Sequence, residues 1–258
     1  MDSHNTDVRV YPQQNRVRRE ISELAYQNRV SIFAADAATA VADLPGPRSS
    51  AHTPTSIRAR LSLTAKRVID IFGAVTGLIL TAPIMLIAAI LIKLESQGSV
   101  VFKQERIGKE GKRFLMFKFR TMCPEAEALK KQLTHLNEMN GPVFKIKEDP
   151  RVTRVGCFLR KYSVDELPQL LHVLTGELSL VGPRPALPEE VQKYEPWQRA
   201  RLTAKPGLTC LWQVNGRNEL DFADWMKLDL EYVEKRSLGL DFRILLKTIP
   251  TVLKGTGV

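Results

Sequence analysis

Cysteine is scarce in this sequence, which holds only Cys123, Cys157 and Cys210 among its 258 residues. The three lie far apart and lack the short spacing of metal-ligating cysteines, so a disulfide framework and a zinc site are both excluded. No apolar core appears near the start, so we expect no signal peptide, and no internal repeat is present. These absences favour reduced thiols in a cytosolic domain.

Acidic residues are in the minority. The chain has 28 Asp and Glu against 38 Lys and Arg, which gives a net charge of +10. Such an excess favours polyanionic partners, namely nucleic acid, phosphorylated metabolites or an anionic membrane surface.

Aromatic residues are few in residues 1–60, which are polar. The stretch at 43–56, DLPGPRSSAHTPTS, is rich in proline, serine and threonine. We therefore expect a mostly disordered polar tail, with a short helix possible inside it that carries no chemistry.

Charge is absent from a run of 22 residues at 71–92, IFGAVTGLILTAPIMLIAAILI. That length is enough for a helix to cross a bilayer, and a core helix of a domain this small would normally keep a polar face. Basic residues such as Lys66 and Lys93 flank the run on both sides, which conflicts with a simple span. Pro83 removes a backbone hydrogen bond near the middle, and the Thr81 hydroxyl is close enough to help there. The pattern favours a re-entrant membrane helix at 61–95, broken at Pro83.

Residues 96–258 have the composition of a compact cytosolic domain. Short strands are expected at 100–104 and 114–119. Helices are expected at 124–139, after a turn at 149, at 165–175 before Gly176, at 221–237 and at 241–255. The last of these suits either a membrane interface or the domain core. The predicted fold class is α-rich α+β, with a small sheet and interfacial amphipathic helices.

Two adjacent carboxylates, Asp165 and Glu166, stand out within Ser163-Val164-Asp165-Glu166. The four residues match a capping box, and acids in a first helical turn complement the helix dipole. On these residues alone, a helix start is the simpler interpretation.

Several cations lie in turns and strand ends elsewhere in the sequence, and they favour a second interpretation. Cations near a carboxylate pair suit phosphate chemistry, because they neutralise phosphoryl oxygens while a carboxylate binds a divalent cation or acts as nucleophile. For Arg154 and Lys161 we keep the interpretation of exposed surface charges. The cations are Lys118, Arg120, Arg151, Arg154, Arg160, Lys161 and Arg184.

Three segments together resemble the bacterial sugar transferases, the monotopic phosphoglycosyl transferases that start exopolysaccharide, O-antigen and glycoprotein glycan assembly. They are FKFRTM (117–122), DPRVTRVGCFLRKYSVDELPQLLHVLTGELSLVGPRP (149–185) and KPGLTCLWQVNGR (205–217). The resemblance runs from about Ala65 to the end of the chain and makes 96–258 the expected catalytic domain.

The resemblance implies transfer of a sugar 1-phosphate from a nucleotide sugar to polyprenol (undecaprenyl) phosphate. Asp165 would be the nucleophile that forms an aspartyl phosphosugar, and Glu166 would bind Mg²⁺. Arg184, in Pro183-Arg184-Pro185, would hold phosphate. Further cationic positions and substrate-binding positions of the family are matched by Lys118, Arg120, Arg151, Gln213 and Arg217.

The resemblance also implies a setting. The partners are a nucleotide sugar, with UDP-glucose or UDP-galactose as our expectation, polyprenol phosphate and membrane lipid, but not nucleic acid. The location is the bacterial cytoplasmic membrane, with the catalytic domain facing the cytoplasm. Ala82 replaces a serine that some members carry before the proline, and Cys210 stands where glycine is common, away from the chemistry.

Two alternatives remain open. A membrane-anchored basic scaffold without catalysis would explain the charge and the anchor. A glycosyltransferase that passes the sugar without its phosphate would release a nucleoside diphosphate instead.

Overall fold

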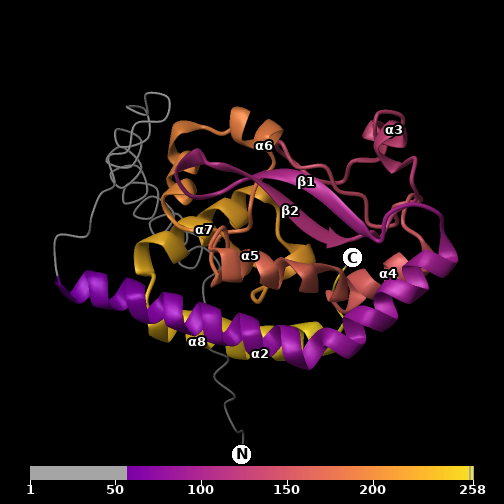
Figure 1. Ribbon diagram of the computed structural model, residues 1–258. Helices are drawn as coiled ribbons and strands as arrows, with labels where there is room; N and C mark the ends of the chain where they lie inside the picture. Colours follow the sequence, from indigo (N-terminus) through magenta and orange to yellow (C-terminus); the bar gives the residue numbers. More distant parts are fainter. Residues whose placement is uncertain (1–56, 256, 258) are drawn as a thin grey trace, which may run out of the picture.

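The computed structural model describes residues 57–255 and residue 257. One long helix, α2 (Ile57–Glu95), runs along one side of the molecule, and the other elements pack against it (Figure 1). The predicted tail at 1–60 lies outside the described residues, except for its last four, which already belong to α2. Two short sheets and several shorter helices complete the fold. The predicted helix-rich class with a small sheet is therefore confirmed.

The remaining elements follow α2 in chain order. The strands are β1 (Val101–Ile107), β2 (Arg113–Phe119), β3 (Ser179–Val181) and β4 (Gly207–Thr209). The α-helices are α3 (Ala126–Lys130), α4 (Arg154–Lys161), α5 (Leu170–Thr175), α6 (Pro188–Gln192), α7 (Phe222–Lys235) and α8 (Leu238–Leu253). The 3₁₀ segments are η1 (Lys109–Gly111), η2 (Thr134–Leu136), η3 (Val164–Gln169), η4 (Pro196–Thr203) and η5 (Arg217–Glu219).

α2 continues through Pro83 as one helix, and Figure 1 shows that it changes direction along its course. Pro83 has no N–H to offer the carbonyl of Ile79, so a bend is expected at this point. Thr81 Oγ1 donates to Gly77 O at 2.7 Å, so the hydroxyl bonds to a carbonyl near the break but not to the freed one. Re-entry into one membrane face stays a prediction.

The first half of α2 is tied to the domain by polar side chains. Lys66 Nζ donates to Asp241 Oδ2 of α8 at 2.6 Å. Arg67 donates to two carbonyls near the end of α5, at 2.5 and 2.7 Å. Asp70 is buried and accepts from the hydroxyl and a backbone N–H of β3. Little more than one turn of α2 is thus fixed to three different elements.

The second half of α2 rests on the same domain through apolar contacts. Ala88 and Ile92 are buried against Phe119 of β2 and Leu159 of α4. Glu95, the last helical residue, accepts from the free N–H of Val155 at the start of α4. Both ends of the apolar run therefore contact one folded body.

The two predicted strands are present as β1 and β2, which pair as an antiparallel hairpin, and β1 extends further than expected. Phe102 lies opposite Lys118 and Arg106 opposite Phe114. Directly opposed residues of an antiparallel pair share a face, and alternate residues of one strand do too, so Arg106 and Lys118 lie on the same face. The backbone N–H of Phe117 donates to the side chain of the buried His172 on α5, which docks the hairpin on that helix.

The predicted helix at 124–139 is wrong for most of its length. Only α3 and the short turn η2 are helical there. Leu136 is exposed, so the leucine spacing that suggested a helix does not give one continuous buried face. Instead the chain turns at Asn137, whose Oδ1 accepts from the N–H of Lys145, and Glu138 N donates to Lys145 O.

The core gathers where β3 and β4, a parallel pair, meet α2, α5 and α8. Leu178, Val173 and Ile244 are among its fully buried residues. α2 approaches closely because Gly73 lacks a side chain: a Cβ there would lie 2.6 Å from Leu180 Cδ1.

The outer surface of α2 and α8 is apolar. By length and composition, α2 is long and apolar enough from Leu61 to Glu95 to cross a membrane. Large apolar side chains on this surface are exposed. α8 has both an exposed apolar side and a side that packs on the core through Ile244, so it combines the two roles that the sequence left open. Exposed members include Phe72, Ile79, Leu80, Ile84, Leu86, Ile87, Phe242, Leu246, Ile249 and Leu253.

Candidate active site

Asp165 and Glu166 lie in η3, a 3₁₀ segment, and not in a regular α-helix as predicted. Ser163 precedes it with a left-handed backbone (φ 54°), and its hydroxyl makes no capping bond. That hydroxyl instead accepts from Arg217 Nη2 at 2.8 Å. The capping-box interpretation is therefore wrong, and neither carboxylate caps the segment that carries it.

The Asp165 carboxyl is buried, with 7% of the residue exposed. Burial is the main cause that raises its pKa from 3.8 to about 6, and the neighbouring Glu166 raises it further. Lys118 and Arg160 oppose this rise. The cations that face Asp165 therefore limit the rise of its pKa and favour the ionised carboxylate.

Lys118 approaches the carboxyl from β2. Its ammonium group lies 5.4 Å from the centroid of the Phe102 ring and has no hydrogen bond or ion pair within residues 57–255. Burial lowers its pKa from 10.5 to about 8, although Asp165 works against that change. A cation without a protein partner beside a buried carboxylate is available to an anionic ligand.

Arg184 is presented by a rigid turn. The prolines on either side, Pro183 and Pro185, are buried while Arg184 itself is exposed. Its carbonyl is fixed by Arg201 Nη2 at 2.8 Å, whereas its guanidinium bonds to no other described side chain. The turn follows a close contact of β3 with β4, where a Cβ on Gly207 would lie 2.0 Å from the backbone nitrogen of Gly182.

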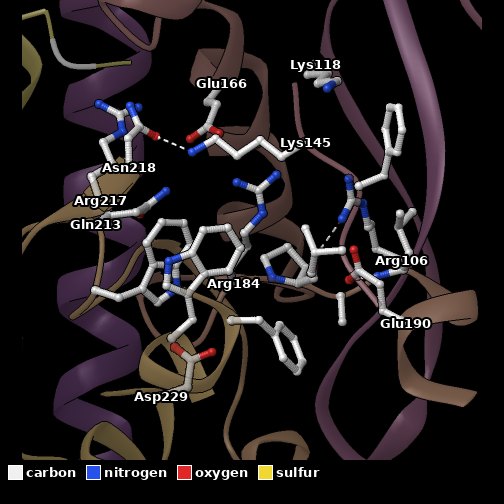
Figure 2. Close-up of a pocket in the computed structure, with 18 of the residues that line it drawn as sticks. Arg106, Lys118, Lys145, Glu166, Arg184, Glu190, Gln213, Arg217, Asn218 and Asp229 are labelled. Atoms are coloured by element: carbon white, nitrogen blue, oxygen red, sulfur yellow. Dashed lines mark hydrogen bonds between the residues drawn. The ribbon is translucent and has the colours of Figure 1, made fainter. Parts of the chain in front are cut away.

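These groups line one cavity of about 250 Å³, which we call the active-site cavity (Figure 2). Eight basic side chains and five carboxylates surround it. Arg151 and Arg201 form ion pairs with Asp149 and Asp229, and basic side chains outnumber carboxylates around the whole cavity. The remaining cations are Arg106, Lys118, Lys145, Arg160, Arg184 and Arg217. The cavity therefore suits an anion with more than one negative charge.

The predicted residues do not all have the same access to this cavity. Arg151 lines it but is held by Asp149 at 2.6 Å and by the carbonyl of Ala126. Gln213 lines it while its Oε1 accepts from the backbone N–H of Cys210 at 3.0 Å. Arg120 does not line it, because its guanidinium donates to the carbonyls of the two residues that follow α2.

Several lining residues were missed by sequence reasoning. Arg106 is 5% exposed, donates to Pro185 O at 3.0 Å, and has a pKa lowered by burial to about 10. Lys145 reaches the cavity from the loop after η2 and donates to Asn218 Oδ1 at 3.0 Å. The hairpin register, which places Arg106 on the face of Lys118, was the signal available for the first. Lys145 gave no signal, because it lies outside every predicted element and every motif that carried the resemblance.

The lower part of the cavity is aromatic and polar. Trp212 and Trp225 stack at 4.3 Å with an angle of 13° between their planes. Beside them lie buried polar atoms without a partner in the described part of the chain, among them Trp225 Nε1, Arg201 Nε and Asp229 Oδ1. Buried polar atoms normally have partners, so these are free to bond to a polar ligand or to water.

The part of the cavity near Asp165 and Glu166 could hold a divalent cation only if a bound ligand supplied further oxygen atoms. Residues 57–255 contain no cluster of three or more metal-ligating side chains. Glu166 and Asp165 are adjacent there, and no basic side chain bonds to Glu166. Mg²⁺ prefers one or two carboxylates completed by phosphate oxygens and water, which matches this pair.

Comparisons with known proteins agree on one family. Residues 61–255 match the model of the family described as bacterial sugar transferase. Galactosyl transferase CpsE of Streptococcus agalactiae is 44% identical over 196 residues, which cover 76% of this chain and 43% of CpsE. Exopolysaccharide production protein ExoY of Rhizobium meliloti is 41% identical over 197 residues, covering 75% of this chain and 87% of ExoY.

A third relative carries a more specific name. Undecaprenyl-phosphate galactose phosphotransferase of Salmonella typhimurium is 39% identical over 206 residues, which cover 77% of this chain and 42% of that protein. The chain thus matches less than half of CpsE and of the Salmonella protein, but most of ExoY. With most of the described residues matched by the family model, the chain belongs to the bacterial sugar transferase family.

Proposed function

We propose that this protein is a phosphoglycosyl transferase, which moves a sugar 1-phosphate from a nucleotide sugar to polyprenol phosphate. The observation that carries the proposal is the buried Asp165 carboxylate, which caps no helix and faces cations in a cavity. The names of the relatives support the same reaction, since one is a phosphotransferase acting on undecaprenyl phosphate.

The first step would be attack by an Asp165 oxygen on the phosphorus that carries the sugar. A bond forms between that oxygen and phosphorus, the bond from phosphorus to the bridging oxygen breaks, and a nucleoside monophosphate leaves with the electron pair. Above pH 6 the carboxyl is ionised, as a nucleophile must be. Its burial removes hydrating water that would weaken the attack.

The cations would stabilise the charge that develops on the phosphoryl oxygens. Arg184 is an exposed residue that lines the cavity, and Lys118 has no hydrogen bond or ion pair to any residue in the described part of the chain. Both are therefore free to bond to the diphosphate without breaking an existing protein contact, which keeps the cost of reorganisation low. Arg106 adds a fixed positive charge, held in place by Pro185.

Glu166 would hold Mg²⁺ together with oxygens of the donor diphosphate. When bound, the metal would neutralise charge on the diphosphate and on the departing nucleotide. Because Glu166 follows Asp165 directly in the chain, it would hold the metal close to the nucleophile.

The second step would release the product to the membrane. An oxygen of polyprenol phosphate attacks the phosphorus of the aspartyl phosphosugar, the acyl phosphate bond breaks, and Asp165 returns as a carboxylate. The product is a polyprenol diphosphate sugar.

The apolar surface of α2 and α8 would rest in the cytoplasmic membrane, with the catalytic domain facing the cytoplasm. Lys66 binds the domain before the apolar run, and Glu95 binds it after the run. α2 is about 58 Å long, longer than a bilayer core, so a straight span would place those two residues on opposite sides. Contacts of both ends with one domain support entry from one face.

The donor would be a UDP-hexose, with UDP-galactose the first to test, because CpsE and the Salmonella relative are both named for galactose. The test is the release of nucleotide from a panel of nucleotide sugars with polyprenol phosphate and Mg²⁺. Release of nucleoside monophosphate is expected. Nucleoside diphosphate would indicate direct sugar transfer, and no release with any donor would favour a scaffold without catalysis.

A further inference from the structure

A second cavity, of about 310 Å³, lies between α2, η3, β4 and α8, and we call it the apolar cavity. Its walls are mainly aliphatic, with threonine hydroxyls between them. The aliphatic residues are Ile84, Val164, Leu167, Leu180, Leu208, Val214, Leu245 and Val252. Few polar atoms are available in these walls for a sugar or a nucleotide, so the cavity suits a hydrocarbon.

The apolar cavity shares part of its wall with the active-site cavity. Glu166, Gln213 and Arg217 line both. Glu166 and Arg217 are also the only charged residues among those that line the apolar cavity. Its polar end is therefore the wall that it shares with the active site.

The other end reaches the apolar outer surface. Ile84 of α2 lines the cavity and is 48% exposed. On α8, Val252 lines the cavity while its neighbour Leu253 is exposed and does not. A hydrocarbon chain in the cavity would thus continue onto the surface that we propose lies in the membrane.

We propose that the apolar cavity binds the first isoprenyl units of polyprenol phosphate and brings its phosphate to Arg217 at the shared wall. This inference rests on the proposed function and assigns different arginines to the two substrates. Arg184 lines the active-site cavity alone and serves the donor diphosphate, whereas Arg217 lines both cavities and serves the acceptor. The remaining isoprenyl units lie in the bilayer.

The chemistry of the walls favours this occupant. The cavity is lined mainly by aliphatic side chains and has the cation Arg217 in the wall that it shares with the active site, which matches a prenyl chain ending in a phosphate. The acceptor phosphate would then approach the aspartyl phosphosugar past Glu166, through a cavity that no residue of the β1–β2 hairpin lines. Donor and acceptor would enter by separate routes, as a two-step reaction requires.

The test separates the two half-reactions in Val252→Trp, which fills the apolar cavity, and in Leu253→Trp, a matched control on the exposed side of α8. Release of nucleoside monophosphate from the donor, without acceptor, reports the first step. Chase of the isolated phosphosugar enzyme with C55 polyprenol phosphate reports the second. Val252→Trp is expected to keep the first step within twofold and to slow the second at least tenfold. Leu253→Trp should keep both within twofold of the unmodified protein.

Three results would overturn the proposal. The first is a Val252→Trp protein with both steps at the unmodified rate. The second is an equal loss of both steps together with a lower unfolding temperature, which would make the cavity a structural part of the core or a phospholipid site. The third comes from the unmodified protein: a C15 prenyl phosphate with a photoreactive group on its chain should label peptides of 208–214 and 245–252, and labelling elsewhere would refute the assignment. Absence of any monophosphate release by the unmodified protein would instead refute the proposed function itself.

Discussion

Replacing Asp165 with asparagine is expected to stabilise the protein while it abolishes the transferase reaction. The carboxyl has 7% exposure and a pKa raised from 3.8 to about 6 by burial and by Glu166. A proton is therefore bound more tightly in the native state than in the unfolded state. Stability from this group is fully present below pH 4 and is lost as the pH rises through 6.

The magnitude follows from the shift. Two pKa units correspond to about 3 kcal/mol at neutral pH, and about half of this remains at pH 5. Asparagine has nearly the same shape and no charge, so it escapes this penalty, although a buried amide without full partners costs about 1 kcal/mol or more. The expected net gain at pH 7.5 is about 1–2 kcal/mol, or a few degrees in the unfolding temperature for a domain of this size.

Thermal unfolding of both proteins in the same detergent, at pH 7.5 and at pH 5, checks this expectation. The gain should shrink at the lower pH. Asp149→Asn is a control of opposite sign: burial opposes ionisation of Asp149, but hydrogen bonds from Arg151 outweigh it and lower the pKa, so that variant should lose stability. An Asp165→Asn protein that unfolds at a lower temperature than the unmodified one at pH 7.5 would refute the reasoning.

The same substitution tests the chemistry. An amide cannot form an acyl phosphate, so activity should fall by several orders of magnitude while the fold remains. In the unmodified protein, the rate of monophosphate release should rise as the pH increases through about 6, because the carboxylate is the reactive form. Full activity of Asp165→Asn, or a rate that falls over that pH range, would exclude Asp165 as the nucleophile.

Three further predictions concern the cations, the metal and the membrane. Arg184→Ala should lower the rate at least a hundredfold with little change in unfolding temperature. Arg120→Ala should instead lower the unfolding temperature more than the rate, because of the two side chains only that of Arg120 bonds to the backbone of the described residues. EDTA should abolish turnover and added Mg²⁺ should restore it; full activity in chelator would remove the metal from the mechanism. Cysteines placed at Ser62 and Ser99 should both react with a membrane-impermeant thiol reagent only from the cytoplasmic face, while Pro83→Leu should favour a straight helix; labelling at Ser62 in intact cells would exclude re-entry.

Features that depend on local sequence were predicted well. The uncharged run at 71–92 falls within one apolar helix, and the two strands of the hairpin appear close to their expected positions. Gly176 ends α5 with a left-handed backbone, as a glycine at that position should. Each of these follows from a few consecutive residues, because periodicity, length and glycine geometry are local properties.

Features that depend on distant partners were predicted poorly. The leucines of 124–139 have helical spacing, but Leu136 is exposed, and only α3 and η2 are helical in that stretch. Ser163 matches a capping box by sequence, yet its hydroxyl bonds to Arg217, 54 residues further along the chain. A local motif therefore fails to predict the structure where its side chain bonds to a distant residue instead.

The sequence by itself determined the apolar helix, the family resemblance and the choice of Asp165 and Glu166 as candidates. Only the tertiary structure decided which cations face them. Arg120 looked equivalent to Arg184, but it is occupied by the end of α2, while Arg106 enters the cavity because Pro185, 79 residues away, holds its guanidinium there. The physical reason is that the charge of a side chain is written in the sequence, whereas its burial and its partners, which set its pKa and its freedom to bind a ligand, are created by segments that meet only on folding.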